Sequence, residues 1–450
     1  MKKLLVMAVL SSAFACIEWP EEAALRARRC SAAPDDVGCA DQVDSGVADA
    51  GRVDAGRVDA GSVDAGGVDS GVDSGVDAGV DAGTDAGRDP PLQTGSWTLH
   101  WRNVSQDEAH FLVGGEAGGT LVGYRADAGL MTLLSLNGTA PVAQATPIPG
   151  ARPTSAYERD ERLAIGLADG TIRVELHQPP AHSPITSRNV GFITTAIDLF
   201  PEVGSLSVAA YGELDGGLAV RSFYALGGQA GDQGVDVPCT TTLMRPQRIL
   251  PMPDAGPGVV VGTVIGSCGF PFSFTSATGG FVGFFGAPGP NSGFTFPAPV
   301  DSPMVLGLIN DQMTLAYRPA NGQLALATLG RNSAPGTPRS ILRGTLVPVD
   351  IVDLGAAGFA VVGWGSGNIS LIDGGSPFVA DGQDVFIARI DQNRDVTELV
   401  VFGGRGDQPA VGAAFIGDRL IIGGSCGVDS ASGLCLDAGT SGSWVAGFSR

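Results

Sequence analysis

The sequence predicts an all-β fold. From about residue 95 onward, short runs rich in β-branched and aromatic residues alternate with Gly and Pro. No stretch of this part places apolar residues at the 3.6-residue period of an amphipathic helix. One apolar motif also recurs at intervals of about 50 residues, which is typical of a repeat architecture. Strands bounded by turns are therefore expected in this part, and the residues before it need separate explanations.

Residues 1–15 are predicted to be a cleaved export signal. Two lysines precede an apolar stretch, residues 4–15, which is too short for the roughly 20 residues of a membrane-spanning helix. The residues Ala13-Phe14-Ala15-Cys16 resemble the lipobox of bacterial lipoproteins. The resemblance implies acylation of Cys16, with Ile17 after it favouring the outer membrane. Ordinary signal peptidase cleavage fits the same residues and would give a periplasmic or secreted protein.

The charge pattern excludes several functions. The chain has 27 Lys and Arg residues, and its only lysines, Lys2 and Lys3, leave with the signal. The mature protein therefore has no lysine for Schiff-base or Ser-Lys chemistry. The formal net charge is −20, and no basic patch interrupts the acidic composition. This balance argues against binding to nucleic acid or to anionic lipid by charge.

Six cysteines remain after Cys16, and they fall into three local pairs. The pairs are Cys30 with Cys39, Cys239 with Cys268, and Cys426 with Cys435. An exported chain with an even number of cysteines is expected to form disulfides, so the segment 16–43 would carry a small Cys30–Cys39 loop. Other connectivities and free buried cysteines remain alternatives. No pair has C-x-x-C spacing, so no zinc site or other metal site is expected.

Residues 44–93 are predicted to be a disordered tether. They repeat Val-Asp-Ala-Gly or Val-Asp-Ser-Gly, with Asp first every five and then every four residues. Neither period suits a strand or a helix, and no aromatic residue offers a core that could offset the chain entropy. The span would be roughly 35–40 Å, or more if charge repulsion extends it. Calcium-ordered repeats are the alternative, but those need a nine-residue period and large apolar residues.

Residues 94–450 are predicted to be one β-propeller domain. Three mostly apolar residues, a Gly or Tyr and a short turn recur in hairpin-like units. The fourth residue of each unit is Gly114, Gly166, Tyr211, Gly262, Tyr317, Gly363 and Gly423. A spacing near 50 residues suits one four-stranded blade, and radial repetition protects the edges of the sheets. Seven blades are therefore expected.

Residues 384–427 carry a family resemblance. They run as a strand ending in Asp391, a turn, a strand ending in Gly403-Gly404-x-Gly406-Asp407, and a strand ending near Gly423. This stretch resembles the SBBP repeat of bacterial seven-bladed propellers. The chain's last residues, 443–450, are similar to the start of another repeat. The resemblance implies a propeller that is closed by a C-terminal strand completing the first blade.

Candidate sites are weak when taken singly. Arg405-Gly406-Asp407 is a tripeptide read by integrins, but here it lies within the repeat's own turn. Asp391-x-Asn393-x-Asp395 opens like a calcium loop and then lacks the required Gly and Glu. The four histidines, at 100, 110, 177 and 182, are scattered. Three of the five tryptophans, Trp97, Trp101 and Trp364, suit a blade core better than a ligand platform. No catalytic or cofactor-binding motif occurs, so no catalytic residue and no cofactor is predicted.

These observations favour a binding function. The expected protein is a monomeric cell-envelope lipoprotein, held to the membrane by its lipid anchor, that presents a propeller on an acidic stalk to a protein or glycan ligand. Loops on one face and the central channel are the expected places for binding. One alternative is an exported propeller hydrolase or lyase with carboxylates around the channel. Another is a structural or display protein with no discrete ligand.

Overall fold

A computed structural model divides the chain into two compact units, Met1–Val80 and Asp81–Arg450. It describes residues 96–449 with short gaps, all within the second unit. The gaps are 106, 116–117, 138–140, 142–145, 160, 179–180, 203–204, 215–216, 227–232, 238–242, 251–257, 269–273, 285–291, 332, 405, 428–433 and 436–441. The predicted signal, lipidation site, Cys30–Cys39 loop and tether lie outside the described residues. So do Cys239 and the side chain of Cys268.

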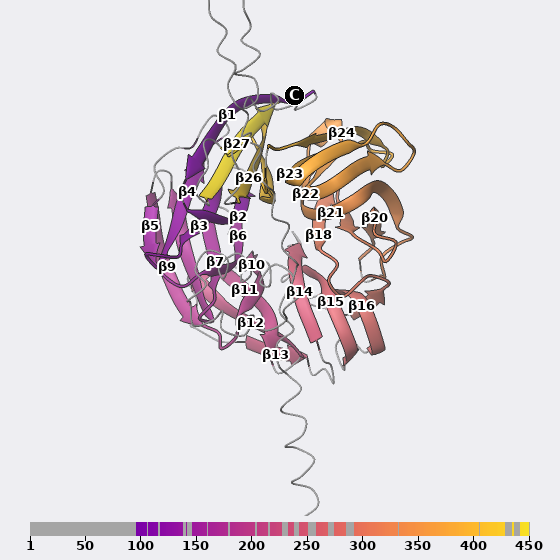
Figure 1. Cartoon of the computed structure of the whole chain (residues 1–450). Helices are drawn as coiled ribbons and strands as arrows, with labels where there is room; N and C mark the ends of the chain where they lie inside the picture. Colours follow the sequence, from indigo (N-terminus) through magenta and orange to yellow (C-terminus); the bar gives the residue numbers. More distant parts are fainter. Residues whose placement is uncertain are drawn as a thin grey trace, which may run out of the picture. The chain divides into compact units, whose positions relative to one another are not determined.

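The described part consists of antiparallel β-sheets, which confirms the predicted all-β class (Figure 1). Besides its strands, it contains a short 3₁₀ turn at Gly355–Ala357. Four of its sheets each contain four consecutive strands. Their strands are β2 (Glu108–Gly115), β3 (Gly118–Arg125), β4 (Leu130–Leu136) and β5 (Thr146–Pro149); β6 (Pro153–Arg159), β7 (Arg162–Leu167), β8 (Thr171–Gln178) and β9 (Ala181–Asn189); β10 (Thr194–Glu202), β11 (Ser205–Leu214), β12 (Gly217–Leu226) and β13 (Gln233–Val237); and β14 (Leu243–Leu250), β15 (Val259–Cys268), β16 (Phe274–Phe284) and β17 (Ser292–Phe296).

A fifth sheet has seven strands in chain order. They are β18 (Met304–Ile309), β19 (Gln312–Tyr317), β20 (Leu324–Leu329), β21 (Arg339–Asp353), β22 (Phe359–Leu371), β23 (Phe378–Ile390) and β24 (Val396–Phe402). The long strand β21 pairs with β20 only through its beginning, and with β22 along most of its length. It therefore joins two four-stranded portions, β18–β21 and β21–β24.

The sixth sheet contains both ends of the described chain. Its order is β1 (Thr98–Ser105), β27 (Gly442–Ser449), β26 (Arg419–Cys426) and β25 (Ala410–Ile416), and Figure 1 shows indigo β1 beside yellow β27. The expectation that a C-terminal strand completes the first blade is wrong, because the N-terminal strand completes the last sheet. β27 pairs with its chain neighbour β26, which costs less loop entropy than a distant pairing and leaves the outer edge to β1.

In six of the seven units the recurring apolar motif lies in β7, β11, β15, β19, β22 and β26. Leu163, Val260 and Ile421, for example, are fully buried in β7, β15 and β26, and a strand buried on both faces reads as a continuous apolar run. The first unit differs because its motif at 111–114 lies in β2, one strand earlier. The units at 163, 208 and 314 are hairpins as expected, whereas those at 360 and 420 lie almost entirely within the single strands β22 and β26. The unit at 259 begins in β15 and runs into residues outside the description.

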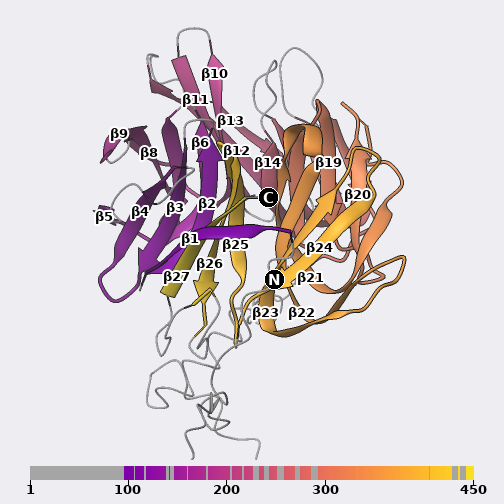
Figure 2. The same cartoon turned by 90° about the horizontal axis from the view of Figure 1, so that it is seen from above.

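The first strands of successive sheets contact one another. β2 contacts β6, and the contacts continue through β10, β14, β18, β21 and β25. β25 in turn contacts β2, so the first and last sheets meet, as Figure 2 shows for the indigo and yellow strands. Buried apolar side chains fill the spaces between neighbouring sheets, such as Ile421 with Leu121 and Ile165 with Met131. This arrangement places the first strands around a common space.

Candidate functional site

The first strands share one irregularity. Six of the seven skip a single residue in their pairing with the second strand and therefore carry a β-bulge. The skipped residues are His110, Thr154, Thr195, Gln247, Val349 and Val411. A bulge bends its strand and re-aims the side chains that follow. Among the residues directly after the bulges, Arg248 and Asp350 occupy equivalent positions, because they lie opposite Val261 and Val362, the third residues of the apolar motif.

Proline directly precedes three of these bulges, at Pro153, Pro246 and Pro348. Proline lacks a backbone donor, so within sheets it is found at bulges and edges. The residue opposite Pro246 is Gly262. A Cβ at Gly262 would lie 1.9 Å from the carbonyl oxygen of Arg245. Glycine at this point of the motif is therefore required by the close approach of the bulged strand.

A cavity of about 990 Å³ lies among the first strands. Residues of β2, β6, β10, β14, β18, β21 and β25 all line it. The lining combines apolar side chains with polar ones, and its charged members are Glu158, Arg159, Glu161, Arg248 and Asp350. Pockets for small ligands have volumes of about 300–1,000 Å³ and a few well-placed polar groups. The cavity meets both conditions.

Arg248 and Asp350 connect three strands across this cavity. Arg248 lies on β14, and its Nη2 donates to the Val349 carbonyl of β21 over 3.0 Å. The Asp350 carboxylate accepts the amides of Ile351 (3.1 Å) and of Ala413 on β25 (3.2 Å). Both side chains are partly exposed and line the cavity. They are thus held in place by main-chain groups while facing a space that a ligand can enter.

The environment of Asp350 changes its acidity. Burial raises the pKa of Asp350 to about 6, and the Arg248 guanidinium and the two amides oppose this rise. A carboxyl is disfavoured in its charged form where solvent is scarce, and a nearby cation restores part of the loss. Asp350 is therefore charged at neutral pH and begins to take up a proton in mildly acidic solution.

A second polar group lies where the first strands end. Glu158 and Arg159 finish β6, and Glu161 follows in the turn to β7. Phe415 near the end of β25 is 39% exposed, which is unusual for so large an apolar side chain in this unit. This end of the cavity therefore offers two carboxylates, a guanidinium and an aromatic ring.

Asp198 on β10 lies beside the cavity wall and was not singled out by the sequence. It is fully buried, and the amides of Gly258 and Leu199 are near its carboxyl. Among the described residues, however, neither of its oxygens accepts a hydrogen bond of standard geometry. Burial raises the pKa of Asp198 to about 7, although Arg159 lowers it. Tyr211, also fully buried, has its pKa raised by burial and by Asp198.

The two turn motifs singled out by the sequence are local turns. Asp391 Oδ1 accepts the amides of Asn393 and Asp395, each at 2.9 Å, and so closes the hairpin between β23 and β24. Asp407 Oδ1 accepts the Gln383 amide at 3.1 Å, while Arg405 lies outside the described residues. These hydrogen bonds support the turn interpretation over the calcium and adhesive ones.

The four histidines do not form one group among the described residues. His100 contacts the hydroxyl of Ser449 at 2.5 Å. His110 is a bulge residue whose pKa burial lowers to about 4, so it is neutral at physiological pH. His177 and His182 pair across the β8–β9 hairpin rather than lying in an open loop, and their side chains are outside the description. No His-based catalytic group forms in the part that is described.

The three singled-out tryptophans serve the core. Trp97 is 4% exposed and belongs to the cluster between the last two sheets. Trp364 and Trp101 are partly buried and pack against neighbouring clusters. None of them lines the cavity. The core interpretation of these residues is confirmed.

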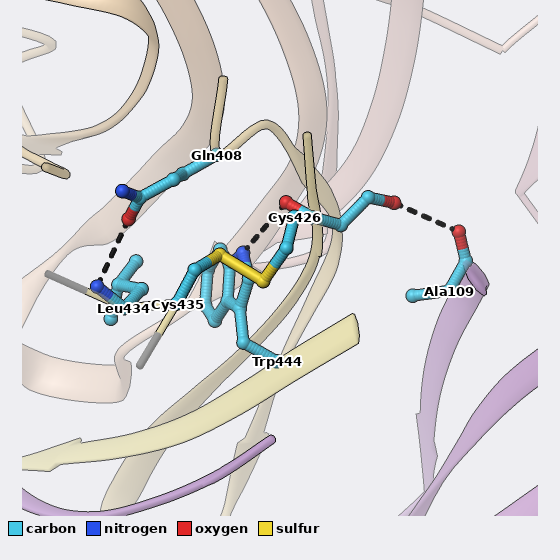
Figure 3. Close-up of a disulfide and its surroundings, with 7 residues drawn as sticks. Ala109, Gln408, Cys426, Leu434, Cys435 and Trp444 are labelled. Carbon is cyan, nitrogen blue, oxygen red and sulfur yellow. Dashed lines mark hydrogen bonds between the residues drawn. A yellow bond between two sulfur atoms is a disulfide. The ribbon is translucent and has the colours of Figure 1, made fainter. Parts of the chain in front are cut away.

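One predicted disulfide is present. Cys426 and Cys435 are bonded and buried at the end of β26, next to Trp444 (Figure 3). The Leu434 amide donates to Gln408 Oε1 at 2.9 Å, which fixes the far side of the loop. Beside the bond, the Ser425 hydroxyl donates to the Ala109 carbonyl of β2 at 3.1 Å. The disulfide therefore stiffens the place where the last sheet meets the first.

Two features are absent from the described residues. No group of three or more His, Cys, Asp or Glu side chains is arranged there to hold a metal ion. Among the same residues, no helix has the length and apolar character needed to cross a membrane.

The charged residues of the cavity were not predicted, because they lie on or next to first strands that do not carry the recurring apolar motif. A usable signal exists, since Arg248 and Asp350 each stand two residues after a proline, in Pro246-Gln247-Arg248 and Pro348-Val349-Asp350. Ser155 follows Pro153 in the same way. A proline inside an otherwise regular strand marks a bulge. In these three strands the residue after the bulge lines the cavity.

Comparison with known proteins gives structural likenesses only. No protein-family model matches the chain, and no curated protein matches it. Among solved structures, Sqt1 of Saccharomyces cerevisiae is 12% identical over 76% of this chain and 87% of that chain, with a TM-score of 0.42. The computationally designed protein Ika8 is 13% identical over 76% of this chain and 97% of that one, with a TM-score of 0.43. The function must therefore be argued from the site itself.

Proposed function

We propose that this chain is a cell-envelope lipoprotein, anchored in the outer membrane, that presents a seven-bladed β-propeller as a binding module on a flexible acidic stalk. Each four-stranded sheet would be one blade, and the seven-stranded sheet would be two blades that share β21. The mutual contacts of the seven first strands support this reading, because a propeller arranges its innermost strands around a central channel.

The cavity among the first strands is the observation that carries the binding function. It combines small-ligand size with charged groups held by the main chain. A rigid scaffold that surrounds such groups is typical of a recognition site. The ligand would be a protein segment or a glycan that reaches the channel, while the tether would let the module meet it away from the membrane.

The anchor has a direct test. Incorporation of labelled palmitate into the full-length protein, expressed in a Gram-negative host, is compared with a Cys16→Ser variant. Label in the parent alone supports the lipoprotein. Absence of label from both contradicts it and indicates a freely exported protein.

The binding function is tested by filling the cavity. Thr195 lines it and is partly exposed, so Thr195→Trp should block the space. Thr397→Trp on the outer strand β24 is the matched control, because Thr397 is exposed and does not line the cavity. Co-sedimentation with peptidoglycan sacculi or binding to lipopolysaccharide should be lost in the first variant and kept in the second. Equal binding by both variants, or no binding by the parent, would contradict recognition through the cavity, and the latter result would favour a display protein.

One observation favours the enzyme alternative. Three carboxylates, Glu158, Glu161 and Asp350, line the cavity, and the pKa of Asp350 is raised toward the range of an acid catalyst. A hydrolase or lyase would require bond cleavage that Glu158→Gln or Asp350→Asn abolishes. Chromatography of the same envelope polymers after incubation with the protein measures such cleavage. Intact polymers would leave binding as the function.

A further inference from the structure

Three large side chains of different chemistry follow bulges and line one level of the cavity. They are Arg248, Asp350 and Phe111, which supply a cation, an anion and an aromatic ring. Arg248 and Asp350 lie opposite Val261 and Val362, the third residues of the apolar motif, so the two side chains occupy equivalent positions on the same face of their sheets.

Arg248 has unused donors at this level. A guanidinium carries several N–H groups in a fixed plane. Only Nη2 makes a hydrogen bond among the described residues, to the Val349 carbonyl. That bond fixes the orientation of the side chain, and the side chain lines the cavity. The remaining donors are therefore positioned for an acceptor that comes from outside the chain.

Asp350 offers the complementary acceptor. Each of its oxygens accepts one main-chain amide, from Ile351 and from Ala413, and a carboxylate oxygen has room for a second donor. Arg248 is close enough to lower the pKa of Asp350. Nevertheless, no direct ion pair joins the two side chains among the contacts of the described residues. A donor and an acceptor therefore face the cavity separately, each held by the main chain.

We propose that this level of the cavity binds a neutral sugar residue, whose hydroxyl groups accept from Arg248 and donate to Asp350. The proposal rests on the binding function proposed above and names its ligand class. A hydroxyl is both donor and acceptor, so adjacent hydroxyls match a guanidinium beside a carboxylate. The C–H face of the ring would pack on Phe111, and Ile249 and Ile351 also line the space.

A charged ligand fits this level less well. An acidic group near Arg248 would also approach Asp350, and an amine near Asp350 would approach Arg248, so attraction and repulsion would oppose each other. A purely apolar ligand would displace water from the remaining donors of Arg248 and acceptors of Asp350 without replacing its hydrogen bonds, which is costly. Neutral polar ligands avoid both penalties.

The test uses the mature full-length chain and defined probes. Saturation-transfer NMR and calorimetry measure binding of methyl β-glucopyranoside, galactose and N-acetylglucosamine, with glucuronic acid and glucosamine as charged counterparts. We expect at least one neutral sugar to bind in the millimolar range and more tightly than both charged counterparts. Arg248→Met and Asp350→Asn should each weaken that binding by about 10- to 100-fold.

Matched controls separate the site from general effects. Arg343→Met and Asp418→Asn change exposed residues outside the cavity and should leave the affinity unchanged. If Arg248→Met does not fold, Arg248→Lys keeps the positive charge beside Asp350 but loses the planar donors, and it should still weaken binding about tenfold.

The outcomes distinguish this inference from the proposed function. Failure of all neutral sugars, or binding that folded Arg248 and Asp350 variants leave unchanged, overturns the sugar site. If envelope polymers still bind in a manner blocked by Thr195→Trp, the binding module stands and only its ligand class is wrong. If no neutral sugar binds and Thr195→Trp does not block the binding of envelope polymers, both proposals are overturned.

Discussion

Burial alters the chemistry of two acids in the first strands to different extents. Arg248 and two amides oppose the effect of burial on Asp350, and its pKa rises to about 6. Arg159 and two amides also lie near Asp198, but burial dominates there and its pKa rises to about 7. The second acid therefore costs stability at neutral pH, because its charged form is poorly solvated in the folded protein.

Asp198→Asn is predicted to stabilise the protein above pH 7. The pKa of Asp198 is raised from 3.8 in the unfolded chain to about 7 in the fold. The free energy of unfolding therefore decreases as the pH rises from about 3.8 to about 7, and this acid does not change it below that range. A shift of this size corresponds to on the order of 4 kcal/mol. Urea unfolding of parent and variant at about pH 5 and pH 8 measures the difference.

The exposed acid Asp418 supplies the control for this prediction. Its side chain is 88% exposed, so Asp418→Asn should change stability little at either pH. A parent protein whose stability does not fall between about pH 5 and pH 8, or an Asp198→Asn variant that is no more stable at pH 8, would show that the carboxyl is solvated in the fold.

At the scale of elements, the bulge and the glycine opposite it form one unit. In β21 and β22, Pro348 stands opposite Gly363. A Cβ at Gly363 would lie 2.2 Å from the Val347 carbonyl oxygen and 2.7 Å from the Phe386 ring. Neither neighbour can move easily, because one is backbone and the other is fully buried. The recurring glycine of the apolar motif is thus explained by the approach of the neighbouring strand.

Gly363→Ala is therefore predicted to destabilise the protein by about 1–3 kcal/mol. Gly150→Ala is the matched control, because a Cβ there would have only Leu167 nearby, at 3.8 Å. Chemical denaturation of the two variants should show a loss for the first and little change for the second. Equal stabilities would mean that β21 and β22 can separate at no cost.

The disulfide acts on the last sheet. It closes a loop between residues nine positions apart, and a loop of this length contributes about 2–3 kcal/mol in the chain-entropy treatment. The double variant Cys426→Ser/Cys435→Ser should lose that amount in denaturant unfolding under oxidising conditions. Addition of a reductant should lower the stability of the parent more than that of the variant. A variant as stable as the oxidised parent would contradict a stabilising role.

At the scale of the whole molecule, closure depends on the N-terminal strand. β1 pairs with β27 along its length, and Trp97 just before it is buried in the last cluster. Ser96 also donates to Glu398 of β24, from its amide at 3.0 Å and from its hydroxyl at 2.7 Å. The segment that would connect to the tether is therefore bound to two sheets at once.

Removal of this strand is predicted to damage the folded unit. A chain that begins at residue 106 exposes the edge of β27 and lacks the Trp97 side chain that fills part of the last core cluster. It should therefore unfold at a temperature lower by several degrees and aggregate. A chain that begins at residue 95 is the control and should match the parent. Thermal unfolding with light scattering compares them, and equal behaviour would show that β1 is dispensable.

Much of the local structure could be predicted because it depends on neighbours in sequence. Continuous apolar runs such as Leu163–Ile165 identify buried strands. Asp391 indicates a turn, because its carboxylate accepts the amides two and four residues later. The candidate site could not be found in this way. Arg248, Val349 and Asp350 meet across two different strands, and no local pattern states which strands become neighbours.

The sequence by itself determined the all-β class, the buried second strands, the Cys426–Cys435 disulfide and the core role of Trp97. Periodicity, turn residues and cysteine spacing act over short distances, so the residues carry that information directly. Only the tertiary structure decided that β1 closes the last sheet and that the first strands gather Arg248 and Asp350 around one cavity. Those features depend on the packing of sheets that are far apart in the chain, where burial and register, rather than local preference, fix each neighbour.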